Sequence, residues 1–336
     1  MKAWQKMLIV AVLATIIVVA GTLVYLNYFS KRRLFISTTT SLYDTGLLTA
    51  IETDYETTHD VDLQITAVGT GVAIQQAENG DADIVLVHAP STELKFLEGG
   101  YGVNRKIIAY NFFTIVGPAD DPAQIAGKTA TEALFNIVRY GENMPDQSEA
   151  TQIWISRSDN SGTNSKEKSL WDRAGYDYEE ISDEVWFSST GQGMGATLTI
   201  ADQKNAYTLA DIGTYLKFHS DGSIALESLI LEEQPLLNVY SVMAVNPLVS
   251  PNAEVHEDIN FNDAMNFIEY LISDPTQEMI SQYGENIYGQ SLFTGAVQPL
   301  IDDTLQPLVS WIQDYAFFEG SECPPQYRND AGNLYS

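Results

Sequence analysis

The sequence predicts an α/β protein with two lobes, and three observations support this. First, strand and helix candidates alternate from residue 34 onwards, a rhythm that favours a mostly parallel sheet with helices on both faces. Second, two apolar strand candidates, residues 112–116 and 239–245, lie where the chain could cross from one α/β unit to another and return. Third, 336 residues at 45% hydrophobic content can fill about two domains of ~150 residues each.

The elements of the first unit follow from apolar spacing. Residues 34–37 predict a strand, and four apolar residues then recur at helical spacing. A cleanly alternating strand, a short helix stopped by Asn79-Gly80 and a fully apolar strand come next. The first strand is Leu34-Phe35-Ile36-Ser37, and the helical spacing is that of Leu47, Leu48, Ile51 and Tyr55. The alternating strand contains Val61, Leu63, Ile65 and Ala67, the short helix spans 72–78 and the fully apolar strand spans 84–87.

A second unit begins after the strand at residues 112–116, where Gly117-Pro118 interrupts the pattern. The strand at 239–245 carries the chain back to the first unit, so the two crossings predict a hinge and a cleft. We therefore expect lobe 1 to comprise 34–116 and 240–296, and lobe 2 to comprise 117–239. Residues 1–33 form a separate N-terminal segment and 297–336 a C-terminal extension, which we expect to pack on a lobe or contact a partner.

The N-terminal segment has the composition of a membrane anchor. Residues 7–28 form a run of 22 without a charge, and a helix of that length reaches ~33 Å, against ~30 Å for a hydrocarbon core. We expect a retained transmembrane helix, with a cleaved signal peptide as the alternative. Basic residues flank both ends, so they do not decide its orientation. The acidic bulk that follows favours an extracytoplasmic domain.

Charge and cysteine content exclude several classes. The chain has 17 basic and 45 acidic residues, a net charge of −28. Five of the basic residues and none of the acidic ones lie in residues 1–33, which leaves −33 for the remainder. Such a surface repels phosphate backbones, so we expect no nucleic-acid binding; it fits a saline habitat or selection for solubility. A single cysteine excludes an intramolecular disulfide framework and Cys-rich metal sites.

Three segments share one design, in which a strand is followed by hydroxyl residues or glycine and then by a helix. They are Thr38-Thr39-Thr40-Ser41, Gly69-Thr70-Gly71, and Ser161-Gly162-Thr163 with Arg157 ahead of it. Helix N-termini offer unpaired N–H groups, hydroxyls add uncharged donors, and an arginine adds a forked cation. Any one segment could be only an N-cap. Together they predict an anion site that needs little positive surface charge.

Other candidate residues favour structural roles. Gly191 to Gly195 predicts a tight turn that opens a helix, with the Gly193 N–H as a weaker candidate ligand contact. His88 ends an apolar strand, where we expect a structural hydrogen bond. Ser161 lacks a nucleophile elbow and a visible activating histidine and acid. We therefore expect no catalytic group, metal or cofactor, and no enzyme activity.

Eight motifs in order resemble the substrate-binding proteins of tungstate ABC transporters, from about Leu34 to Phe293. The longest are TTTSLYDTGLL, NGDADIVLVHAP, YNFFTIVGPADDPAQI and SRSDNSGTNSKEKSLW. The resemblance implies a type II periplasmic-binding-protein-like fold, with two mixed sheets flanked by helices and a ligand cleft between lobes. It also implies a monomer that delivers tungstate or molybdate to a membrane permease and its ATPase, for tungsten cofactors. The implied ligand contacts are Thr39, Thr40, Ser41, Thr70, Arg157, Ser161 and Thr163.

Asp159 separates the candidate anions. Tungstate and molybdate are unprotonated dianions near neutral pH and only accept hydrogen bonds, so their site should consist of donors. Phosphate still carries a proton, and its binders profit from a carboxylate acceptor. We expect Asp159 to orient Arg157 from behind, which favours tungstate or molybdate. The alternatives are a phosphate-binding protein, if Asp159 points into the cleft, and an anchored oxyanion sensor or enzyme domain on the same fold.

Overall fold

The computed structural model describes residues 3–28, 31–144, 152–248 and 259–335. Within the first helix it describes the side chains of Trp4, Gln5 and residues 12–22. Helices and strands alternate through most of the chain, and the helices are α1 (Ala3–Tyr28), α2 (Thr40–Asp44), α3 (Leu47–Thr58), α4 (Thr70–Glu78), α5 (Pro90–Glu98), α6 (Ala130–Glu142), α7 (Gly162–Arg173), α8 (Tyr178–Ser182), α9 (Met194–Lys204), α10 (Ile212–Ser220), α11 (Phe261–Ile272), α12 (Asp274–Gln282), α13 (Glu285–Tyr288), α14 (Val297–Asp302) and α15 (Leu308–Ala316). The strands are β1 (Arg32–Thr39), β2 (Val61–Val68), β3 (Ile84–Val87), β4 (Gly102–Gly117), β5 (Trp154–Ser156), β6 (Phe187–Ser189), β7 (Thr208–Asp211), β8 (Glu227–Ile230), β9 (Leu237–Val245) and β10 (Thr294–Gly295), with short 3-10 turns η1 (Gln234–Leu236) and η2 (Pro325–Tyr327).

The first lobe is built on strands in the order β10-β4-β9-β3-β1-β2. Strands β1, β2 and β3, which the sequence predicted from their apolar residues, are parallel as expected. Strands β9 and β4 pair antiparallel, so this sheet is mixed rather than mostly parallel. Antiparallel pairing follows because β4 leaves the lobe and β9 returns to it. Helix α3 packs through Tyr55 against Phe267 of α11, and α4 and α5 bury Ile74 and Phe96 in a separate cluster.

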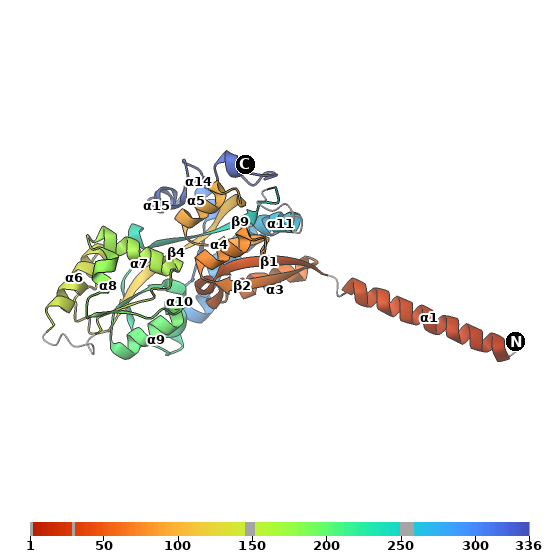
Figure 1. Cartoon of the computed structure of the whole chain (residues 1–336), viewed down its shortest axis with the longest axis horizontal. Coiled ribbons are helices and arrows are strands. Elements are labelled where there is room, and N and C mark those ends of the chain that lie inside the picture. The colour runs from red at the N-terminus through yellow and green to blue at the C-terminus, as the bar shows by residue number, and fades with distance from the viewer. Residues whose placement is uncertain (1–2, 29–30, 145–151, 249–258, 336) are drawn as a thin grey trace.

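Strand β4 connects the two halves of the molecule. Its residues 102–112 pair with β9, and its last residues, 113–117, pair with β7 and β8. The two sheets expected from the resemblance are therefore joined through one 16-residue strand. The second lobe is completed by the parallel pair β5–β6, which is tied to β7 by a bridge between Trp154 and Tyr207. Figure 1 shows β4 and β9 running between the first lobe and the helices α6 to α10.

The C-terminal extension packs on the first lobe, above it in Figure 1. Arg105 of β4 is fully buried, pairs with Glu93 of α5 and donates to the carbonyl oxygens of Ala316 and Glu322. The Glu322 carboxylate in turn binds Lys106. The extension thus supplies carbonyl and carboxylate partners for Arg105 and Lys106, two buried cations of β4.

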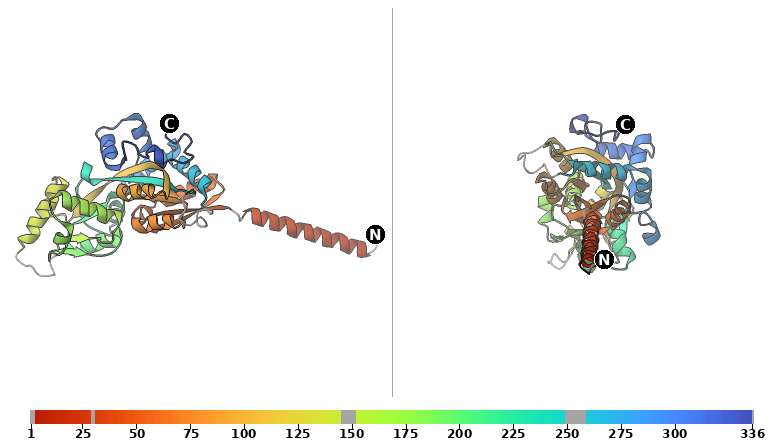
Figure 2. Two further views of the ribbon diagram at one scale, coloured as in Figure 1. Left: turned by 45° about the horizontal axis from the view of Figure 1, so that its top comes forward. Right: turned by 90° about the vertical axis from the view of Figure 1, so that its right-hand side faces the viewer.

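Helix α1 projects away from both lobes, as Figure 1 and the left view of Figure 2 show. The expected transmembrane helix at Met7–Tyr28 is not supported, because no helix in the described part of the chain is both long and apolar enough to cross a membrane. The side chains of residues 6–11 and 23–28 lie outside the described residues.

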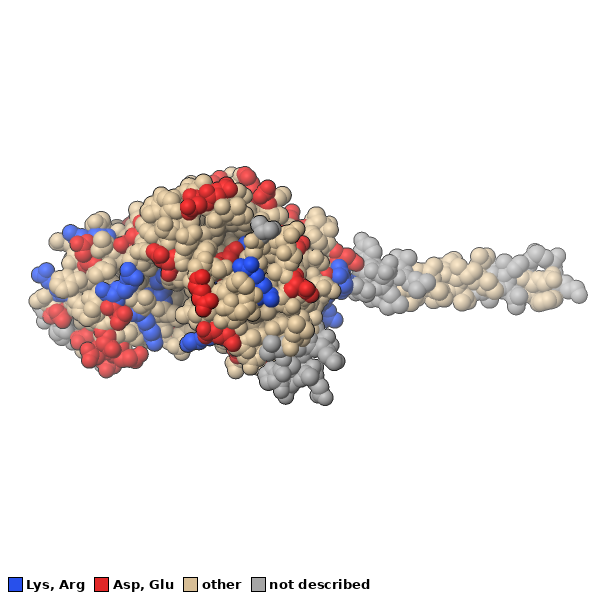
Figure 3. All heavy atoms as spheres, turned by 90° about the horizontal axis from the view of Figure 1, so that it is seen from above, with Lys and Arg blue, Asp and Glu red and all other residues tan. Residues whose placement is uncertain are grey.

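On one face of the molecule, the acidic side chains are spread out rather than gathered in one region. On the face seen in Figure 3 they lie over both lobes, with Lys and Arg interspersed among them. The surface field is therefore negative without a separate basic patch on this face, and an anion must be bound by local donors.

Candidate functional site

The hydroxyl segment of the first lobe lies where β1 ends and α2 begins. Thr39 caps α2, and its Oγ1 accepts from the Leu42 N–H at 3.4 Å. Ser41 is buried with its Oγ 3.3 Å from Thr39 Oγ1, whereas Thr40 is half-buried. A threonine after an apolar strand thus starts the helix and places hydroxyls at its N-terminus.

Thr70 lies at the same edge of the sheet. Strand β1 pairs in parallel with β2, and Thr39 is the register partner of Val68. Two residues later Thr70 begins α4, whose N-cap is Gly69, without a side-chain cap. The Thr70 side chain is 4% exposed, and its Oγ1 has no hydrogen-bond partner within the described structure. A buried hydroxyl without a partner costs about 1–3 kcal/mol, so this donor suits a ligand.

The second-lobe segment surrounds Arg157. Strand β5 ends at Ser156, and α7 begins at Gly162 after a loop in which Ser158 and Asn160 have positive φ. Ser161 caps α7, and its Oγ accepts from the Asn164 N–H.

Arg157 is 3% exposed and is held on two sides. Its Nε and Nη2 donate to Asp159 Oδ2 at 3.1 and 2.5 Å, and its Nη1 donates to Thr163 Oγ1 at 3.2 Å. The other carboxylate oxygen of Asp159 accepts from the Ser161 N–H. These contacts use three of the five guanidinium N–H groups. Asp159 therefore orients Arg157, as expected, and both of its oxygens are engaged within its own loop.

The two segments meet at His88. The His88 Nε2 lies 3.2 Å from Ser41 Oγ, and a Cβ built on Gly162 would lie 2.9 Å from His88 Cε1. Glycine at the start of α7 therefore allows the second lobe to approach the strand end that holds Ser41. The Lys217 Nζ of α10 also donates to the carbonyl of Asp44 in α2, at 2.6 Å. The lobes are closed on one another here.

Of the predicted contacts, six are almost fully buried, at 6% exposure or less: Thr39, Ser41, Thr70, Arg157, Ser161 and Thr163. Gly193 differs, because it is exposed and the space beside its Cα is open. It caps α9 two residues after Gly191, whose N–H donates to the Arg157 carbonyl. In this arrangement Gly193 does not belong to the buried group.

His88 makes the structural hydrogen bond expected from the sequence. Its Nδ1 lies 2.9 Å from Asn238 Oδ1, and its ring packs 4.9 Å from that of Tyr240. Burial and the nearby cations Arg157 and Lys166 together lower the pKa of His88 to about 4, although the hydrogen bond to Asn238 acts in the opposite direction.

Several buried ionisable groups around the site were not singled out by sequence reasoning. Glu167 accepts from Trp154 Nε1 and Ser156 Oγ, both at 2.7 Å, and burial raises its pKa to about 7. Lys166 donates to the Leu237 carbonyl at 2.8 Å, and burial lowers its pKa to about 7. Asp211 caps α10, and burial raises its pKa. Glu167 and Lys166 lie within the SRSDNSGTNSKEKSLW motif. The sequence signal that could have identified them is the presence of charged residues in a helix that packs against the site.

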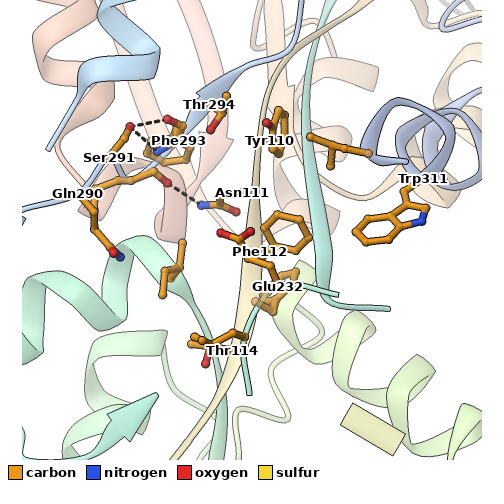
Figure 4. A pocket seen from close by; sticks show the side chains of 15 residues that line it. Tyr110, Asn111, Phe112, Thr114, Glu232, Gln290, Ser291, Phe293, Thr294 and Trp311 are labelled. Atoms are coloured by element: carbon orange, nitrogen blue, oxygen red, sulfur yellow. Dashed lines mark hydrogen bonds between the residues drawn. The ribbon is translucent and has the colours of Figure 1, made fainter. Parts of the chain in front are cut away.

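A separate cavity of about 550 Å³ lies beside β4 where its pairing changes. Figure 4 shows it between Phe112 and Thr114 of β4, the 290–294 segment and Trp311 of α15. The Asn111 amide points toward the Leu292 carbonyl on this side. None of the predicted anion contacts lines this cavity.

Among the described residues, no group of three or more His, Cys, Asp or Glu side chains is placed to hold a metal ion. The arrangement at Arg157 is instead one of hydroxyls, backbone N–H groups and a single guanidinium. Chemically, these groups can hold an anion through hydrogen bonds.

Comparison with known proteins places the chain among binding proteins of this design. Residues 30–275 match the family model described as "PBP superfamily domain". A putative ABC transporter anion-binding protein of Haloferax volcanii is 41% identical over 79% of this chain and 72% of its own length. The tungstate-binding protein TupA of Peptoclostridium acidaminophilum is 36% identical over 79% of this chain and 86% of its own.

A solved structure extends the similarity to the fold. The tungstate-binding protein TupA from Desulfovibrio alaskensis G20 has a TM-score of 0.66 and 37% identity, covering 79% of this chain and 99% of that one. These matches confirm the resemblance inferred from the eight motifs.

Proposed function

The chain belongs to the PBP superfamily, and we propose that it is the substrate-binding protein of an ABC importer that captures tungstate, with molybdate as the competing ligand of the same shape and charge. Two relatives named as tungstate-binding proteins share 36–37% identity with it over 79% of its length. The proposed activity is binding and delivery, without catalysis and without a cofactor.

The observation that carries this proposal is the engagement of Asp159. Both of its oxygens accept hydrogen bonds from Arg157 and Ser161. A bound hydrogen phosphate would need an acceptor for its own proton, whereas tungstate has none to donate. Because the Asp159 carboxylate is turned toward Arg157 and its own loop, the arrangement favours the fully deprotonated dianion.

The remaining proposed contacts are donors. Hydroxyls of Thr39, Thr40, Ser41 and Thr70 come from the first lobe, and Ser161, Thr163 and Arg157 come from the second. The partnerless hydroxyl of Thr70 supports a ligand on the first-lobe side. The near-complete burial of six of these residues means that an anion enters only when the lobes separate.

Binding then couples to transport through lobe closure. The dianion contacts donors from both lobes only in the closed state, so it shifts the population from open to closed. We expect the closed form to dock on a membrane permease that works with an ATPase, and the binding protein to act as a monomer.

The function places the two lobes on the extracytoplasmic side. Anchoring by residues 7–28 stays a prediction from the sequence that the structure does not support, and the function does not depend on it.

A thermal-shift panel with tungstate, molybdate, phosphate and sulfate tests the proposal. A ligand at 100 times its dissociation constant stabilises the native state by ~2.7 kcal/mol. For a protein of this size that raises Tm by several degrees, at ~2–4 °C per kcal/mol. We expect a large shift with tungstate and little with phosphate or sulfate; the molybdate shift ranks selectivity. A shift with phosphate alone would establish a phosphate-binding protein, and no shift with any anion would reject the oxyanion site.

A further inference from the structure

A buried chain of side chains leads from the hinge cavity to the candidate site. The Asn111 Nδ2 donates to the Leu292 carbonyl at 3.2 Å, and Asn238 Nδ2 donates to Asn111 Oδ1 at 2.9 Å. His88 Nδ1 then lies 2.9 Å from Asn238 Oδ1, and His88 Nε2 lies 3.2 Å from Ser41 Oγ. Asn111, Asn238, His88 and Ser41 are each at most 5% exposed.

The backbone carbonyl at one end fixes the direction of each hydrogen bond from Leu292 as far as His88 Nδ1. A carbonyl oxygen only accepts, so Asn111 must turn its NH₂ toward Leu292 and its oxygen toward Asn238. Asn238 must then present its NH₂ to Asn111, and the same NH₂ also donates to the Tyr240 hydroxyl at 2.8 Å. Its oxygen is left for His88. His88 therefore carries a proton on Nδ1 in either charge state, and Nε2 is the nitrogen that titrates.

The charge state of His88 decides what Ser41 can offer to a ligand. In neutral His88 the bare Nε2 accepts the Ser41 hydroxyl proton. Ser41 Oγ and Thr39 Oγ1 are 3.3 Å apart, so these two hydroxyls hold two protons between them. A neutral His88 uses one of the two. A protonated His88 donates Nε2–H to Ser41 Oγ and releases that proton, so the two hydroxyls have one more donor to share between their mutual contact and the site.

We propose that His88 is a positioning residue that takes up a proton when the dianion binds, and thereby converts Ser41 from a donor to His88 into a donor to the site. This inference rests on the proposed function, because only an anion that accepts every hydrogen bond requires the conversion. Anion binding is then accompanied by the uptake of a proton at His88. This proton adds a positive charge beside the ligand without a second surface cation.

The charged and titratable groups around His88 set the sign of this linkage. Those that lie on the elements and loops around it are Arg157, Lys166, Glu167, Asp211, Tyr240, Asp44 and Glu93, and the Glu93 carboxylate accepts from the N–H of Ala89, next to His88, at 2.7 Å. In the closed arrangement with no anion bound, burial and the cations Arg157 and Lys166 hold its pKa at about 4, against the hydrogen bond to Asn238, so it is neutral near pH 7. The negative charge of a bound dianion offsets the effects of burial and of the two cations, and it therefore raises the pKa of His88. Affinity should then fall as pH rises, by up to tenfold per unit, between the pKa values of the free and bound states.

Nitrogen NMR of the histidine side chains measures the proposed step directly. The chain has four histidines, so replacing His59, His219 and His256 one at a time with Gln assigns the His88 signals by elimination. In the free protein at pH 7.5 we expect a protonated Nδ1 and a bare Nε2. With saturating tungstate we expect protons on both nitrogens. A bare Nε2 in the tungstate complex would overturn the proposal.

Titration calorimetry between pH 6.5 and 8.5 supplies the second measurement. The His88→Gln variant places an amide that donates to Ser41 at every pH, so the part of the pH dependence due to His88 should disappear. The His59→Gln variant, at a half-buried histidine that stacks on Tyr55 away from the candidate site, should keep the wild-type dependence. Lys166 and Glu167 also titrate near neutral pH and contribute equally to both variants. An unchanged pH dependence in folded His88→Gln would contradict the inference.

The same experiments separate this inference from the function on which it rests. If tungstate produces no binding heat and no NMR change, the proposed function fails. If tungstate binds while Nε2 stays bare, the function stands and the His88 proposal alone is wrong. Should His88→Gln not fold, the NMR spectrum of the unmodified protein still decides.

Discussion

The two halves of the candidate site differ in how they hold a ligand. The first-lobe half consists of neutral hydroxyls at the starts of α2 and α4, and one of them, Thr70, has no partner. The second-lobe half holds Arg157, whose guanidinium is already oriented by Asp159 and Thr163. The second lobe therefore holds its positive charge, Arg157, in place before the ligand arrives. The other lobe supplies donors whose bonds form only on closure.

The largest expected effect is on the charged half. Arg157→Ala should weaken tungstate binding by about 2–5 kcal/mol, or roughly 30-fold to several thousandfold, because it removes the buried guanidinium of the candidate site and leaves Asp159 unpaired. Titration calorimetry measures the loss. Arg139→Ala, at an exposed arginine of α6, is the matched control and should bind normally. Near-normal affinity in Arg157→Ala would remove the asymmetry between the lobes.

The contact between the halves comes next. In Gly162→Ala the new Cβ would lie 2.9 Å from His88 Cε1, so the closed state must shift or repack. Overpacking of this kind costs about 1–3 kcal/mol, which predicts roughly 5- to 150-fold weaker tungstate binding. Gly193→Ala places its Cβ in open space and should leave affinity unchanged. Equal affinities for the two variants would mean that closure at His88 does not contribute to binding.

The orientation of Arg157 provides a smaller test. In Asp159→Asn the charge that holds the guanidinium is lost, while one acceptor oxygen remains. We expect about tenfold weaker tungstate binding, since charge-assisted bonds are roughly twice as strong as neutral ones. Asp183→Asn changes an exposed acid and serves as the control. If phosphate binding fell more than tungstate binding, Asp159 would be a ligand contact rather than a support for Arg157.

The smallest effect is expected in the neutral half. Thr70→Val removes a hydroxyl that bonds to nothing in the described structure, so the free protein should be no less stable. Tungstate binding should weaken by about 0.5–1.5 kcal/mol, or roughly 2- to 12-fold.

Thr208→Val is the converse variant. The Thr208 hydroxyl donates to the Ile155 carbonyl at 2.7 Å, so its loss should lower thermal stability by a similar free energy without a direct effect on affinity. Lower stability in Thr70→Val would indicate that its hydroxyl serves the fold rather than a ligand.

The sequence predicted local elements and helix starts well, because these depend on nearby residues. Strands β1, β2 and β3, and the hydroxyls at the starts of α2, α4 and α7, follow from apolar alternation and capping chemistry. The antiparallel pairing of β4 with β9 was missed by the strand rhythm, since it joins segments more than a hundred residues apart. Rhythm along the chain carries no information on such a pairing.

The site was predicted in its parts but not in its connections. The motif residues Arg157, Ser161 and Thr163 were identified from type and spacing, and six of the seven main predicted contacts are buried. The bonds from Ser41 through His88 to Asn238 were not predicted, although His88 was expected to be structural. Asn238 lies 150 residues from His88 along the chain, and its role appears only when β9 returns beside β3.

Anomalous scattering from tungsten in crystals of the complex tests the central claim most directly, because it locates the metal atom without assuming its contacts. We expect one strong peak between the lobes, with oxygen ligands of the metal within hydrogen-bond distance of Thr70, Ser41 and Arg157. A peak confined to one lobe, or one in the cavity beside β4, would contradict the claim that the two halves share the anion.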